Sequence, residues 1–226
     1  MKKLSFTCLA LLLSLGVFAQ KTIIHAGRLI DVKSQKVLTE QTIVVEGDRI
    51  VSVTAGYQNP AKGDKVVDLK ISTVMPGLMD MHVHIENQTS PTRYVDGFRD
   101  NEADVAYKAL PYAQVTLMSG FTTVRDMGGS GVNIALRNAI NNGLVVGPRI
   151  YTAGKSIAPT GGHADPTNGV KRELMGDPGP DQGVINGPYD ARKAVRQAVK
   201  YGSDVIKVTA TGGVLSVARD GSAPQF

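Results

Sequence analysis

Residues 74–86, VMPGLMDMHVHIE, decide the fold, because an apolar, strand-forming run ends there in two histidines two positions apart. Alternate side chains of a β-strand share a face, so His82 and His84 point the same way, with Asp80 beside them. The opposite face is expected to be buried, and it carries only apolar residues: Met79, Met81, Val83 and Ile85. Two imidazoles on one rigid strand indicate part of a metal site, since imidazole binds zinc and related divalent metals.

A His-x-His pair alone is a weak motif, because it also occurs on solvated sheet faces. The Pro76-Gly77 turn and the apolar back of the strand favour the metal site over that alternative. The motif PGLMDMHVH also resembles the first barrel strand of the amidohydrolase superfamily. This resemblance implies a metal-dependent hydrolase built on a (β/α)₈ barrel.

The N-terminus resembles a secretory signal. Lys2 and Lys3 precede an apolar run that ends in the small-residue site Val17-Phe18-Ala19, so residues 1–19 are expected to be a signal peptide that is cleaved after Ala19. The mature protein would then be exported, to the periplasm or the medium. The apolar run within residues 1–19 is too short to span a membrane.

Composition narrows the chemistry and the partners. The single cysteine lies in the signal peptide, so histidine, carboxylate and modified lysine remain as metal ligands. A net charge of +5, with scattered basic residues and 5% aromatics, does not predict nucleic-acid binding. We expect a small-molecule substrate and no stable membrane insertion, and a homo-oligomer is compatible with the sequence.

Residues 20–73 are expected to form a small β-sandwich domain. Two short apolar strands flank Gly47-Asp48, a two-residue turn that suits a type II′ hairpin. Further strands are expected at 22–32 and 66–69. The segment resembles the accessory sheet that precedes the barrel in many amidohydrolases.

Residues 74–226 alternate between strands and helices, which predicts a parallel α/β sheet. Strands are expected at 122–126, 149–153 and 204–211, and helices around 106–117, 132–140 and 191–199. A doubly wound sheet also fits this alternation, but His84 at the end of its strand favours a barrel, where functional groups lie at the carboxyl ends of the strands. A complete barrel takes about 250 residues. The prediction is therefore the first half of a TIM-like (β/α)₈ barrel, from a protein roughly twice as long.

Lys207 is the second candidate site residue, because it lies in the middle of the apolar strand in DVIKVTATGG, residues 204–213. A buried ammonium needs a partner, so the lysine either pairs with a carboxylate, acts as a neutral amine, or reacts with carbon dioxide to form a carbamate.

Three motifs together resemble the branch of imidazolonepropionase-like and Xaa-Pro dipeptidase-like enzymes, in which this lysine is carboxylated: DVIKVTATGGV, GFTTVRDMGG and TAGKSIAPTGGH. The resemblance implies that His82 and His84 bind one metal and that a carbamate on Lys207 bridges two divalent ions, expected to be zinc. Two further histidines and a catalytic aspartate would follow residue 226.

His163 lies in a long loop, residues 158–188, that leaves the third strand at the same end as the metal site. Long loops in compact folds are often functional, so we expect His163 to bind substrate, with an exposed loop histidine as the alternative. Arg125 and Asp126 end the second strand, where they either support the metal ligands or form an ion pair.

These residues predict metal-assisted hydrolysis of a C–N bond in a small amide, dipeptide or cyclic amide. The chain alone, without the second half of the ligand set, is expected to be inactive. Two alternatives stay open, a non-catalytic scaffold of the same fold and a phosphotriester or ester hydrolase on the same metals.

Overall fold

The structure, a computed structural model, describes residues 20–214, 216–217 and 221–226. The expected signal peptide, residues 1–19, lies outside the described residues. The chain divides into two compact units, Met1–Pro76 and Gly77–Phe226. We expected the boundary after residue 73, but Val74 still pairs with Leu29 in the first unit, so the boundary lies three residues later.

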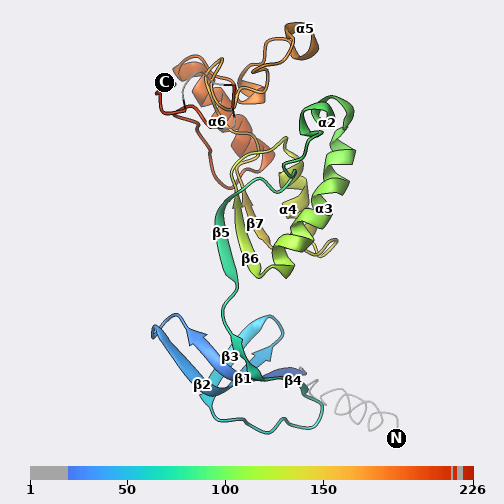
Figure 1. The fold of residues 1–226 in the computed structure, drawn as a ribbon, viewed down its shortest axis with the longest axis vertical. Coiled ribbons are helices and arrows are strands. Elements are labelled where there is room, and N and C mark those ends of the chain that lie inside the picture. The colour runs from blue at the N-terminus through green and yellow to red at the C-terminus, as the bar shows by residue number, and fades with distance from the viewer. Residues whose placement is uncertain (1–19, 215, 218–220) are drawn as a thin grey trace, which may run out of the picture. The chain divides into compact units, whose positions relative to one another are not determined.

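The first unit is one four-stranded sheet in the order β3-β2-β1-β4 (Figure 1). Its strands are β1 (Lys21–Asp31), β2 (Lys36–Glu46), β3 (Arg49–Ala55) and β4 (Lys65–Val74). The β2–β3 turn has φ +59° at Gly47, as a type II′ turn requires at its first central residue. The described strands form a single sheet, and the expectation that residues 20–73 are the N-terminal part of a β-sandwich domain stays a prediction.

The second unit is built on a parallel sheet in the order β5-β6-β7, formed by β5 (Leu78–Val83), β6 (Phe121–Asp126) and β7 (Arg149–Thr152). Its main helices are α3 (Glu102–Met118), α4 (Val132–Asn141) and α6 (Pro188–Tyr201). Three short helices accompany them: α2 (Arg93–Arg99), α5 (Arg172–Met175) and η1 (Pro180–Gln182). Each parallel strand leads to its neighbour through a helical crossover, which is the pattern of a partial (β/α)₈ barrel.

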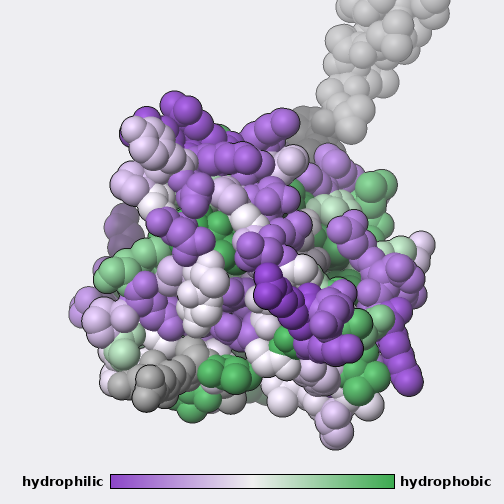
Figure 2. Space-filling view, turned by 90° about the horizontal axis from the view of Figure 1, so that it is seen from above, coloured by the Kyte–Doolittle hydropathy of each residue, from purple (hydrophilic) through white to green (hydrophobic). Residues whose placement is uncertain are grey.

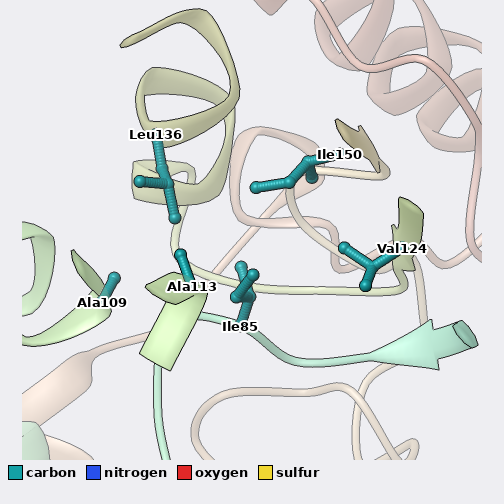
Figure 3. Close-up of a cluster of buried hydrophobic side chains, with 6 residues drawn as sticks. All are labelled: Ile85, Ala109, Ala113, Val124, Leu136 and Ile150. Carbon is teal, nitrogen blue, oxygen red and sulfur yellow. The ribbon is translucent and has the colours of Figure 1, made fainter. Parts of the chain in front are cut away.

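The core of this unit lies between the strands and helices α3 and α4, and Figure 3 shows its side chains converging. Val124 and Ile150 face Leu136 of α4, while Ala109 and Ala113 of α3 are fully buried. Alanine at these two positions lets the helix backbone come close to the sheet. The predicted apolar stripe of this helix is therefore confirmed.

Two details of the predicted elements are corrected. The helix expected around 106–117 begins earlier, at Glu102 of α3, after a capping box in which the Asn101 N–H donates to Asp104 Oδ2 at 2.9 Å, and Pro111 lies inside it. The back of the histidine strand is only partly buried, since Met79 and Met81 are 67% and 50% exposed. Both methionines lie on β5, which is an edge strand of the described sheet, whereas Ile85 beyond its end is buried in the core.

The expected fourth strand, 204–211, is not a regular strand in the structure. The segment runs parallel to the chain after β7 and keeps only separated hydrogen bonds, from Asp204 N to Thr152 O at 2.8 Å and from Thr209 N to Ile157 O at 2.9 Å. Between these contacts Gly154 has φ +64°, which turns the chain away from the extended conformation. The ladder is interrupted at that point.

Among the described residues, no helix is long and apolar enough to cross a bilayer. On the face drawn in Figure 2, hydrophilic residues predominate and hydrophobic ones form smaller patches between them.

Candidate metal-binding site

The structure brings His82 and His84 together at the carboxyl end of β5, as predicted. Their ring centroids are 5.5 Å apart and their planes are inclined by 58°. His84 Nδ1 lies 2.7 Å from the carbonyl oxygen of Gly128, which can only accept a hydrogen bond. Nδ1 is therefore the protonated nitrogen, and Nε2 keeps a lone pair that can bind a metal.

Lys207 lies close enough to influence this pair. Partial desolvation lowers the pKa of the His82 imidazole, and the positive charge of Lys207 lowers it further. Within the described residues, no carboxylate lies within 4.0 Å of Lys207 Nζ, so the alternative of a structural ion pair finds no partner there. Lys207 is half-buried near the histidine pair, which is compatible with both remaining roles, a neutral amine and a carbamate.

Asp126 lies fully buried at the end of β6 and supports the turn that carries His84. Its Oδ2 accepts the N–H of Ile85 at 2.9 Å, and its Oδ1 accepts Gly128 N at 3.1 Å and Asn133 Nδ2 at 2.9 Å. Burial raises the pKa of this carboxyl, against the opposite effect of the three hydrogen bonds. Three donors directed at two oxygens fit a carboxylate that organises the backbone.

Glu86 is a buried carboxylate that the sequence reasoning missed, and it supports the start of α4. This residue is 4% exposed, and its two oxygens accept Ser130 N at 2.7 Å and Asn133 N at 2.6 Å, so it caps the N-terminus of α4 from another segment. The available signal was an acidic residue directly after the buried apolar Ile85. A carboxylate in that position needs donors, and the first turn of a following helix supplies them.

Arg125 and Asp126 do not form the ion pair that was left open. Arg125 Nε donates to the carbonyl of Met81 at 2.8 Å, which ties β6 to β5, while Asp126 is satisfied by N–H groups. The Asp80 side chain accepts the N–H of His82 at 2.9 Å and so supports the same strand. These contacts hold the histidine strand in place.

His163 lies beside the chain that follows Lys207. A Cβ built on Gly213 would fall 2.2 Å from the His163 ring, so the ring packs directly on that glycine, and His163 Nδ1 is buried with no hydrogen-bond partner among the described residues. Its loop is organised by Asp165, which accepts Gly161 N at 2.7 Å, Thr167 N at 2.9 Å and Thr167 Oγ1 at 2.7 Å. The sequence reasoning did not identify Asp165.

The donor set fits a divalent metal, although it is partial. In the described part of the chain, no group of three or more His, Cys, Asp or Glu side chains could hold an ion. His82 and His84 can supply two ligands, and the carbonyl of Gly128 fixes one ring nitrogen of His84. Lys207 lies near this pair, but its side chain becomes an anionic ligand only as a carbamate.

A parallel sheet with helical crossovers and a histidine pair at the carboxyl end of a strand defines the class of (β/α)₈-barrel proteins. Residues 73–226 match the model of the amidohydrolase family, and the chain belongs to that family. The resemblance seen in the sequence is thereby confirmed.

Known relatives agree with this assignment. Ochratoxinase of Aspergillus niger is 31% identical over 212 residues, which are 88% of this chain and 44% of that protein. A crystal structure of a Xaa-Pro dipeptidase with bound methionine is 50% identical with a TM-score of 0.85, and covers 92% of this chain and 51% of that one. A prolidase complexed with N-methylphosphonate-L-proline is 30% identical with a TM-score of 0.79, over 92% and 50% of the two chains. The chain thus spans about half the length of these relatives.

Proposed function

We propose that the full-length protein is a metal-dependent hydrolase that cleaves a C–N bond in a small amide or dipeptide. The observation that carries this proposal is the histidine pair, in which the bond from His84 Nδ1 to Gly128 leaves Nε2 free at the carboxyl end of a barrel strand. The similarity to a Xaa-Pro dipeptidase and a prolidase favours a dipeptide with C-terminal proline as the first substrate to test.

In this proposal His82 and His84 would hold a divalent metal ion, expected to be zinc, and a carbamate on Lys207 would serve as a further anionic ligand. The ammonium of Lys207 first loses a proton; the resulting neutral amine adds to the carbon of carbon dioxide and loses a second proton, which leaves a carbamate anion with two oxygens. The absence of a carboxylate partner near Lys207 in the described residues supports this, because an ion-paired ammonium would not react. A bound metal would supply Lewis acidity toward a water and the substrate carbonyl.

The chain's own residues then orient the reactants. His163 is proposed to contact the substrate, because it lies in the long loop that follows β7 and its Nδ1 has no hydrogen-bond partner among the described residues. The catalytic aspartate and two further histidine ligands are proposed to belong to the second half of the barrel. We also propose that the protein is exported, as its N-terminal sequence indicates.

The test uses full-length protein, with metal analysis and a substrate panel. The wild type should contain divalent metal and hydrolyse Xaa-Pro dipeptides faster than aryl esters or phosphotriesters. His82→Ala and His84→Ala should each lose most of the metal and the activity, because few ligands can be removed from such a site. A metal-free wild type without hydrolase activity would instead support the scaffold alternative, and faster phosphotriester cleavage would change the reaction class.

A further inference from the structure

We propose that Asp126 is the positioning residue that sets the orientation and tautomer of His84. The inference rests on the proposed function, since it concerns the readiness of His84 to bind a metal. Asp126 does not touch the imidazole. It acts through the two backbone segments between which the ring is held.

The first route runs through the chain next to His84. Asp126 Oδ2 accepts the N–H of Ile85 at 2.9 Å, so it fixes the peptide that follows His84. Ile85 itself is buried in the core. The Cα–Cβ direction of His84 is therefore determined on its carboxyl side by a hydrogen bond to a different strand.

The second route runs through the acceptor of the ring proton. Asp126 Oδ1 accepts Gly128 N at 3.1 Å, and the carbonyl of the same Gly128 accepts His84 Nδ1–H at 2.7 Å. The Asp126 carboxylate thus binds both the peptide that follows His84 and Gly128, whose carbonyl selects the tautomer of the His84 ring. Such supporting bonds to a ligand histidine fix which nitrogen faces the metal.

The turn at Gly128 has little freedom to find another arrangement. Gly128 has φ +146°, and a Cβ there would lie 2.3 Å from Ser156 Oγ, so the backbone passes close to the next loop. Ser156 Oγ in turn donates to the carbonyl of Met127 at 3.0 Å. Packing against Ser156 fixes the path of the turn, and the bond from Gly128 N–H to Asp126 is one of the contacts that hold Gly128 within it. Without that bond the Gly128 carbonyl can move away from His84 Nδ1.

Glu86 provides a matched control in the same region. Both carboxylates are buried, and both contact Asn133, but Glu86 accepts only N–H groups of Ser130 and Asn133 at the start of α4. It has no hydrogen bond to the peptide after His84 or to Gly128. Asp126→Asn and Glu86→Gln each replace one acceptor oxygen with an NH₂ group, so they impose comparable local damage with different consequences for His84.

The experiment compares full-length wild type, Asp126→Asn and Glu86→Gln by two measurements. The first is the zinc dissociation constant, from competition with a chelator. Asp126→Asn should weaken zinc binding by about 10- to 100-fold, the range found for lost supports of ligand histidines, while Glu86→Gln stays near the wild type. The second is nitrogen NMR of the histidine rings in metal-free protein. It should show His84 with Nδ1 protonated in the wild type and Glu86→Gln, and a mixture of tautomers in Asp126→Asn.

Equal zinc affinity and an unchanged His84 tautomer in Asp126→Asn would overturn the inference, as would equal losses in both variants, which would reveal general destabilisation. Circular dichroism and thermal unfolding establish that each variant is folded, and Asp126→Ser is a second variant should Asp126→Asn fail to fold. Failure of the proposed function is distinguishable, because a wild type that binds no zinc refutes the metal site while the tautomer measurement still tests the role of Asp126.

Discussion

Replacement of Asp165 by asparagine should loosen the loop that carries His163 without unfolding the barrel. The carboxylate accepts three hydrogen bonds within this loop, from Gly161 N, Thr167 N and Thr167 Oγ1. Asparagine offers one acceptor oxygen and turns an NH₂ group toward a donor, so one partly buried N–H loses its partner. That loss costs about 1–3 kcal/mol, which corresponds to about 5- to 150-fold faster local opening.

Hydrogen exchange measured amide by amide reads this quantity directly. At neutral pH the amides of Gly161 and Thr167 should exchange faster in Asp165→Asn by the stated factor, while amides of β6 stay unchanged. Asp177→Asn is the matched control, because Asp177 is exposed in the same loop and accepts no hydrogen bond from the described residues. Equal exchange in the two variants would refute the role assigned to Asp165.

The effect should also depend on pH in a defined direction. Burial raises the pKa of Asp165, but the hydrogen bonds from Gly161 and Thr167 outweigh it and place the pKa below its ordinary value of 3.8. A lowered pKa means that the carboxylate stabilises the loop above pH 3.8 and that this stabilisation is lost as the pH falls through the folded pKa. The wild type should therefore approach Asp165→Asn in acid, and a constant difference from neutral to acidic pH would contradict the assignment.

Three further predictions concern Lys207, the turn at Gly128 and the N-terminus. Lys207→Ala should abolish activity, and added formate or acetate should restore part of it because a small carboxylate can take the place of the carbamate. Lys207→Arg should not recover, since its guanidinium stays charged. An unmodified Lys207 amine turned away from bound metals in a high-resolution map would contradict the carbamate. Gly128→Ala should lower the free energy of unfolding in urea by about 1–2 kcal/mol, since alanine is strained at this positive φ. Adding Ser156→Ala should remove only the clash between the new Cβ and Ser156 Oγ and leave the backbone strain. An unchanged free energy of unfolding in Gly128→Ala would refute this prediction. N-terminal sequencing of exported protein should begin at Gln20, and retention of Met1 in a cytosolic protein would rule out the signal peptide.

Local spacing in the sequence was enough to predict the histidine pair and most of the barrel elements. A two-residue spacing places His82 and His84 on one face of any strand, and a helical period marks Ala109 and Ala113 as buried, because both periods follow from backbone geometry alone. Local spacing did not reveal that Gly154 interrupts the fourth strand or that Met79 lies on an exposed edge. Those outcomes depend on which neighbours a strand has.

The buried contacts around the candidate site were decided by the tertiary structure alone. The bonds from His84 to Gly128, from Ile85 to Asp126 and from Asn133 to Glu86 join residues 44, 41 and 47 positions apart. No period in the sequence spans such distances. Parallel strands joined by helical crossovers bring the ends of β5 and β6 and the start of α4 to one edge of the sheet, and the buried carboxylates there need N–H donors that only this folded arrangement supplies.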